Sequence, residues 1–187
     1  MSILANLTTD SSIANEKDSI GGSRAIETGI YTFTVQHAYI GKSSGGAISL
    51  NLNLKTEDNK ELKQQLWMTS GTAKGSKNFY TDKNGDKQYL PGFLMANSMC
   101  LLTVGKEISE LDTEQKVIPL YNADAKAEVP TKVDMLMDLI GKEITAAVFK
   151  QTVDKTKKNE STGAYEPTGE TREENEIDKF FRASDKK

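Results

Sequence analysis

The chain has 187 residues, a net charge of −3 and an apolar fraction of 36%. This length fits one domain with a tail, and the slightly negative balance excludes a uniformly basic nucleic-acid binder. One cysteine, Cys100, and one histidine, His37, exclude an internal disulfide and a zinc site built from cysteine and histidine.

The first part of the chain changes from an irregular segment to three strands. Residues 1–27 show little periodicity, and we interpret them as a flexible N-terminal arm. Apolar and polar side chains then alternate over 29–40 and 47–55, and a third strand follows through Leu62 and Met68. Turn residues separate the three segments, which predicts a meander.

A glycine-rich loop and a short hairpin come next. Asn84-Gly85 favours a tight turn between Phe79-Tyr80 and Gln88–Leu90, because both central positions need positive φ. The loop Gly71–Lys77 superficially resembles a phosphate-binding loop. It lacks the G-x-x-x-x-G-K-[ST] spacing, and a hairpin rather than a helix follows it.

Four further elements complete the predicted body. We expect a helix over Phe93–Leu102, a short strand over Glu114–Tyr121, a second helix over Pro130–Ile140 and a last strand over Ile144–Thr156. Residues 28–158 therefore predict a mainly β fold with small helices: an oligonucleotide-binding (OB) fold, that is, a five-stranded, partly open Greek-key barrel with a hairpin and helix insertion. An SH3-like barrel or an α+β sandwich would give a similar order of elements.

Residues 159–187 form an acidic C-terminal segment. Residues 159–178 contain seven acids and one base, and glycines and a proline accompany them, which predicts a disordered tail. Adjacent phenylalanines suggest a motif that docks on a protein partner; the alternatives are a solubilising tail or an amphipathic helix that packs on the body. The predicted partner-binding residues are Glu173, Glu174, Glu176, Ile177, Asp178, Phe180 and Phe181.

Lysines and aromatic residues alternate in two parts of the body. Residues 60–90 contain six lysines and three acids, and residues 142–158 contain five lysines and two acids. Single-strand binding without sequence choice needs cations that follow the phosphates and rings on which bases stack. The predicted single-stranded DNA contacts are Tyr31, Lys63, Trp67, Lys74, Lys77, Tyr80, Lys83, Lys87, Tyr89, Lys150, Lys155 and Lys157.

Catalytic patterns are weak, so we expect no enzyme, no cofactor and no metal site. His37 falls within a predicted strand, without a nucleophile pattern around it. Asp58, Asp82 and Asp86 fall in predicted turns, where aspartate serves backbone geometry. A magnesium-dependent nuclease is the remaining, least favoured enzymatic hypothesis.

Four motifs resemble small phage-encoded single-stranded DNA-binding proteins: Leu66–Gly75, Tyr89–Phe93, Ala127–Thr131 and Thr168–Phe181. The resemblance spans about residues 26–181. It implies an OB barrel that coats single strands during replication and recombination, with an acidic tail that contacts replication enzymes and competes with DNA. The chain departs from that pattern because Arg182, Lys186 and Lys187 follow the acidic segment.

The predicted function is therefore sequence-independent coating and protection of single-stranded DNA. A recombination mediator or strand-annealing protein, and a protein–protein adaptor that does not bind DNA, are the alternatives. Both a monomer and a dimer remain open. No apolar run suggests a signal peptide or a membrane span, so we expect a cytoplasmic protein, in the host cell if a phage encodes it.

Overall fold

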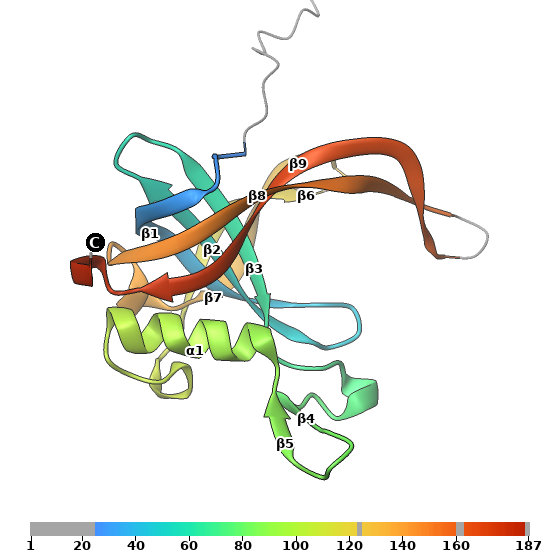
Figure 1. Ribbon diagram of the computed structural model, residues 1–187, viewed down its shortest axis with the longest axis horizontal. Helices are drawn as coiled ribbons and strands as arrows, with labels where there is room; N and C mark the ends of the chain where they lie inside the picture. Colours follow the sequence, from blue (N-terminus) through green and yellow to red (C-terminus); the bar gives the residue numbers. More distant parts are fainter. Residues whose placement is uncertain (1–24, 123–124, 160–162, 186–187) are drawn as a thin grey trace, which may run out of the picture.

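The computed structural model describes residues 25–122, 125–159 and 163–185. Within these ranges the protein is mainly β, which confirms the predicted class (Figure 1). The main sheet has seven strands; its path runs β3-β2-β1-β7-β6, while β8 pairs with β1 and β9 pairs with β8. The strands are β1 (Gly29–Lys42), β2 (Ile48–Thr56), β3 (Glu61–Trp67), β4 (Phe79–Thr81), β5 (Lys87–Tyr89), β6 (Glu114–Asn122), β7 (Ala127–Met135), β8 (Glu143–Lys158) and β9 (Tyr165–Phe181).

The first three strands form the predicted antiparallel meander. Alternation explains it, because β2 turns Leu50, Leu52 and Leu54 into the core and its polar residues outward. In β1 the register with β2 shifts between Val35 and His37, as at a β-bulge. The shift changes which residues of the second half of β1 face the core.

The strand β1 has two neighbours along its other edge. Residues 29–34 pair with β8, whereas Tyr39 and Ile40 pair with β7. The strand β9 follows β8 and returns to β3, where the Ile177 amide donates to Gln64 Oε1 across 3.4 Å. Strands β3, β2, β1, β8 and β9 thus surround one core, and the β6–β7 hairpin extends the sheet beside β1.

The helix α1 (Pro91–Thr103) packs on this core and confirms the predicted helix over Phe93–Leu102. The proline ring fixes φ near the helical value, so Pro91 suits the first turn of the helix. Ala96, Met99 and Cys100 are fully buried, and the helix contacts β3, β8 and β9. Short 3-10 helices are η3 (Thr72–Lys74), η4 (Ile108–Glu110), η5 (Met137–Leu139) and η6 (Ala183–Asp185).

The second predicted helix, over Pro130–Ile140, is wrong. This segment contains most of β7, followed by η5. The more buried residues of β7 alternate with exposed ones, which is the period of a strand; they are Val129, Thr131, Val133 and Met135. Pairing with β6 along the whole of β7 decides the conformation, and β-branched residues favour it.

The predicted disorder of the acidic segment is also wrong for residues 165–181. They form β9, which pairs with β8 along its length, so β9 belongs to the body rather than to a separate tail. Ile177 and Phe180 are only 2% and 3% exposed. Composition suggested disorder because the acids are concentrated, but β8 supplies lysines beside them and the core accepts the apolar residues.

Ile26 lies at the start of the described chain and packs into the core, although the sequence placed it in the arm. Asn175 of β9 holds it: the Ile26 amide donates to Asn175 Oδ1 across 2.8 Å, and Asn175 Nδ2 donates to the Ile26 carbonyl across 2.7 Å. The rest of the predicted arm, residues 1–24, lies outside the described residues. No helix in the described ranges is long and apolar enough to cross a membrane.

Candidate nucleic-acid interface

The outward face of β1, β2 and β3 carries side chains in three cross-strand rows. Successive residues of a strand face opposite sides, so these side chains point away from the leucines of the core. Neighbouring strands bring residues that are distant in sequence next to one another. The rows are His37, Asn53 and Lys63; Tyr39, Asn51 and Gln65; and Gly41, Ser49 and Trp67.

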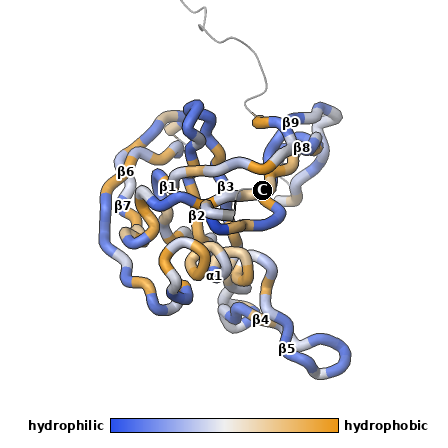
Figure 2. The backbone as a smooth tube through the Cα atoms, turned by 60° about the vertical axis from the view of Figure 1, so that its left-hand side comes forward, coloured by the Kyte–Doolittle hydropathy of each residue, from blue (hydrophilic) through white to orange (hydrophobic). Residues whose placement is uncertain are grey.

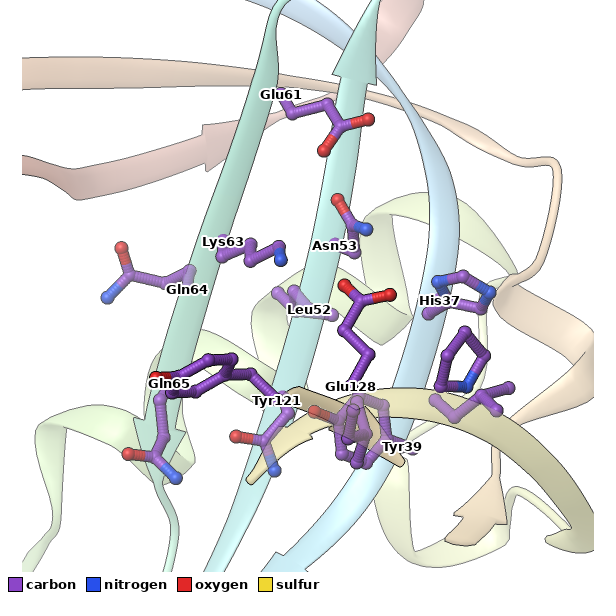
Figure 3. A pocket seen from close by; sticks show the side chains of 14 residues that line it. His37, Tyr39, Leu52, Asn53, Glu61, Lys63, Gln64, Gln65, Tyr121 and Glu128 are labelled. Atoms are coloured by element: carbon purple, nitrogen blue, oxygen red, sulfur yellow. The ribbon is translucent and has the colours of Figure 1, made fainter. Parts of the chain in front are cut away.

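The β6–β7 hairpin stands beside the first two rows and encloses a groove of about 530 Å³ (Figure 3). Tyr121 of β6 and Glu128 of β7 contribute to its wall, while His37 and Asn53 belong to the face of the sheet. Ligand pockets commonly have volumes of about 300–1,000 Å³. The groove is therefore large enough for a small organic group such as a nucleobase.

The groove is weakly charged. Lys63 is its only lysine or arginine among the described lining residues, and Glu61 and Glu128 oppose it. Within the described part of the chain, Lys63 makes no ion pair. Burial raises the pKa of Tyr39 further above its ordinary value, and the phenol, which is protonated at neutral pH in any case, can donate a hydrogen bond.

The amide side chains of this face differ in the hydrogen bonds that they make. Ser49 Oγ accepts hydrogen bonds from the amides of Asn51, at 3.3 Å, and Gln65, at 3.2 Å. Gly41 leaves the necessary space, because a Cβ there would lie 2.3 Å from Asn51 Nδ2. Asn53 Oδ1, in contrast, is buried and has no hydrogen-bond partner among the described residues.

Trp67 ends the third row and is 42% exposed. The start of α1 fixes its backbone, because Gly92 lies directly against it. A Cβ at Gly92 would approach the Trp67 carbonyl oxygen to 2.2 Å. The fold thus holds the backbone of this exposed residue at the end of the polar face.

The β4–β5 hairpin projects from the body (Figure 2). The Lys87 ammonium lies 4.1 Å from the ring centroid of Phe79 and 4.6 Å from that of Tyr89, and the Lys77 ammonium lies 5.7 Å from Phe79. The Tyr89 ring also stacks on Phe93 at 5.5 Å. Tyr89 is therefore partly used in packing, and these contacts hold both lysines close to the hairpin.

Tyr80 and Lys83 belong to the same hairpin and are exposed. Lys74 is exposed on η3, beside the loop that joins β1 and β2. Thr72 connects the two loops, since both its amide and its hydroxyl donate to the Gly45 carbonyl across 2.9 Å. The structure therefore gathers Lys74, Lys77, Lys83 and Lys87 in the segment that follows Trp67.

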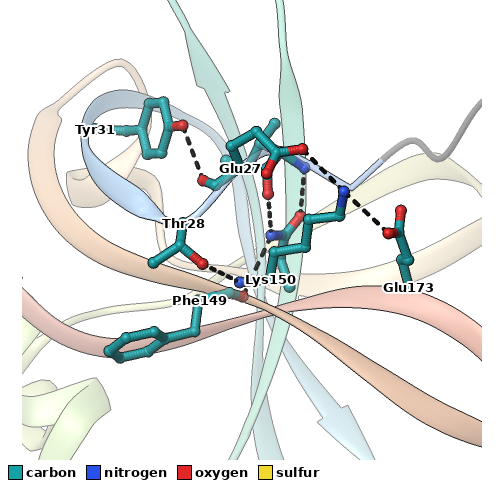
Figure 4. Close-up of polar contacts among 8 residues, drawn as sticks. Glu27, Thr28, Tyr31, Phe149, Lys150 and Glu173 are labelled. Carbon is teal, nitrogen blue, oxygen red and sulfur yellow. Dashed lines mark hydrogen bonds and ion pairs between the residues drawn. The ribbon is translucent and has the colours of Figure 1, made fainter.

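The lysines of β8 face the acids of β9. Lys150 Nζ lies 2.9 Å from Glu27 and 3.0 Å from Glu173, and hydrogen bonds to Glu27 and then Glu173 raise its pKa (Figure 4). Lys155 lies 2.9 Å from Glu170 and lowers the pKa of that carboxyl. Two of the three lysines predicted here to contact phosphate are thus ion-paired within the protein.

Lys157 is the third of these lysines and is exposed, opposite Glu166 in the ladder. Tyr31 lies on the side of β1 that carries Phe33, packs against the core, and donates its hydroxyl to the Glu27 carbonyl across 2.8 Å. It does not line the groove. The predicted contacts therefore form separate groups: Lys63 with Trp67, the hairpin and its loop, and the β8 region.

Ile177 and Phe180 are corrected from partner-binding residues to core residues. The register shift between Ala147 and Val148 places both on the inward side of β9, although they are three positions apart in the sequence. Phe181 is half-buried, with the Lys179 ammonium 5.6 Å from its ring. Of the acids, Glu173 pairs with Lys150, Glu174 pairs with Arg172, Glu176 accepts from Gln151, and Asp178 is exposed.

Sequence reasoning missed Tyr39, Asn51, Asn53, Tyr121 and Glu128. The alternation of β2 already turned both asparagines away from the leucines, and this signal was available. Tyr121 and Glu128 had no comparable signal, because the segment after β6 was interpreted as a helix. The wall of the groove exists only through the pairing of β6 with β7.

No protein-family model matches the sequence, and no curated protein matches it. Among the described residues, no group of three His, Cys, Asp or Glu side chains is placed to hold a metal ion. The case for a function therefore rests on the arrangement of the polar face, the groove and the lysine-bearing hairpin.

Proposed function

We propose that the protein binds single-stranded DNA without requiring a particular sequence, and that it coats and protects single strands during phage DNA replication and recombination. The proposal is of a binding protein rather than an enzyme. The observation that carries it is the polar outward face of β1–β3, which ends at exposed Trp67 next to a hairpin with four nearby lysines. Sequence-tolerant binders combine such rings and cations.

We also infer an OB barrel. The order β3-β2-β1-β8-β9, the return of β9 to β3, and a helix between the third and fourth of these strands in the chain support it. OB folds bind oligonucleotides on the face of their second and third strands and through the neighbouring loops. That face corresponds here to β2 and β3, which carry Asn53, Lys63 and Trp67.

Separate groups of residues take separate roles in this proposal. Trp67 and Tyr80 offer exposed rings for base stacking, and Lys63, Lys74 and Lys83 offer exposed ammonium groups for phosphates. Lys155 can exchange its carboxylate partner for a phosphate, because exposed ion pairs contribute only about 0–1 kcal/mol, whereas the Lys150 side chain is only 22% exposed and pairs with two carboxylates. The β8 lysines are therefore secondary contacts.

The test uses Trp67, the only tryptophan in the chain, as a reporter. Titration with a mixed-sequence oligonucleotide is expected to quench its fluorescence, with an affinity that falls as salt rises. In gel-shift titrations, Trp67→Ala should weaken binding by about 5–150-fold, the equivalent of one stacked base.

Leu101→Ala is the matched control, since Leu101 is 43% exposed near the opposite end of α1 from Trp67 and should leave affinity unchanged. No binding at low salt, or binding that ignores salt, would refute the proposed function.

A further inference from the structure

Among the described residues, Asn53 carries the one side-chain polar atom that is buried without a hydrogen-bond partner. This atom is Oδ1, and the amides of Asn51 and Gln65, in contrast, both donate to Ser49. A buried acceptor without a partner costs free energy, and such an atom in a native protein calls for a water, an ion or a ligand group that satisfies it. The missing group must be a donor, and because the oxygen is buried, the Asn53 amide has to turn toward the groove to meet a ligand there.

The surroundings of Asn53 narrow the chemistry of that donor. Glu61 and Glu128 also line the groove, so carboxylate oxygens add to the acceptors there (Figure 3). A phosphate offers only acceptors and negative charge, and these carboxylates repel it. The edge of a nucleobase with an exocyclic amino group provides the N–H that these oxygens accept.

We propose that the groove admits nucleobases edge first and prefers cytosine and adenine to thymine, with Asn53 as the residue that selects the amino group. This inference rests on the proposed single-strand binding. Cytosine N4 and adenine N6 are donors, whereas thymine has the acceptor O4 at the corresponding position. Thymine would therefore direct a carbonyl oxygen at an environment rich in acceptors.

The rows of the sheet explain how a strand can bind in this way. Lys63 lies beside Asn53 in the ladder and reaches the groove, so it can contact a phosphate while the base enters. Tyr121 is 68% exposed on the wall and offers a ring face to the base. The protein would then bind any single strand through stacking and phosphates, with a preference for composition set by Asn53.

The experiment compares oligo-dC, oligo-dT and oligo-dU of equal length at pH 7.5, with Trp67 fluorescence as the readout. The wild-type protein should bind oligo-dC at least about fivefold more tightly than oligo-dT. A fivefold ratio is the lower end of the discrimination that one base contact provides. Oligo-dU lacks the thymine methyl group but keeps the carbonyl, so it should bind as weakly as oligo-dT.

Asn53→Leu should bring the dC-to-dT ratio close to one. It should not lower the thermal stability, because it removes an unpaired buried acceptor. Asn53→Ala removes the same acceptor with a smaller side chain and should also bring the ratio close to one, so this variant decides the question if the leucine variant unfolds. Lys55→Met, on the same strand but outside the groove, should leave the ratio unchanged.

Equal affinity of the wild-type protein for dC and dT, tight binding of dU, or an unchanged ratio in Asn53→Leu would overturn the inference while single-strand binding stands. No binding to mixed-sequence DNA or to any homopolymer would instead refute the proposed function itself. The two failures are therefore distinguishable in one set of titrations.

Discussion

Phe180→Ala is the sharpest test of the place of β9 in the fold. Phe180 is 3% exposed, lies opposite Ala146 of β8, and belongs to the main core. Phe181, the next residue, is half-buried and has a lysine near its ring. An exposed docking motif would make the two phenylalanines equivalent for stability, whereas the structure makes them very different.

The expected loss follows from burial. Replacing a fully buried phenylalanine by alanine removes its transfer free energy and leaves a cavity, which together destabilise a protein by about 3–5 kcal/mol. Domains of this kind have about 5–15 kcal/mol of stability in total. Phe181→Ala should cost about 1 kcal/mol, typical of a partly exposed side chain.

Urea unfolding, followed by circular dichroism, measures the difference. With a slope of about 2 kcal/mol per molar urea, the middle of the usual range, Phe180→Ala should lower the midpoint by roughly 1.5–2.5 M, and Phe181→Ala by much less. Equal midpoints for both variants would refute the assignment of β9 to the core. Deletion of residues 165–187 should then unfold the protein rather than tighten DNA binding, since it removes a core strand.

Two further predictions test the core and its packing against the polar face. Gly92→Ala should destabilise the protein by about 1–3 kcal/mol and shift the Trp67 emission, because the new Cβ would lie 2.2 Å from the Trp67 carbonyl oxygen. Thermal unfolding measures the loss of stability, and fluorescence measures the shift. Wild-type values in both measurements would contradict the close packing. Burial raises the pKa of Cys100 to about 12, so a thiol reagent at pH 8 should leave Cys100 of the native protein unmodified. In denaturant the pKa returns to about 8.5, and the reagent should label Cys100 rapidly. Rapid labelling of the native protein would contradict the burial of Cys100.

The parts of the fold that the sequence predicted are those decided by local patterns. The meander follows from the alternation of β2, and the helix α1 from an apolar run that begins at Pro91. Residues 130–140 carry both a strand and a helical spacing, because a strand is followed there by a 3-10 turn. Pairing with β6, which is not visible locally, decides between them.

The candidate site was predictable only in part, for the same reason. Lys63 and Trp67 were predicted as contacts, and the structure places both on one face of β3. Asn53 lines a groove only because Tyr121 and Glu128, more than sixty residues away in the chain, form part of the opposite wall. No local pattern of charge or hydropathy reports that an acceptor will be buried without a partner.

The pairing of β8 with β9 also changes where a polyanion would approach. By sequence, residues 60–90 and 142–158 are both rich in lysine. The acids of β9 lie against the second segment and offset its charge, whereas the lysines of the loop and hairpin after Trp67 have fewer carboxylates beside them. Local charge rather than the total steers a charged ligand. In the proposed function, the field that attracts a single strand would therefore come from the hairpin and would direct the strand to the end of the face where Trp67 is exposed.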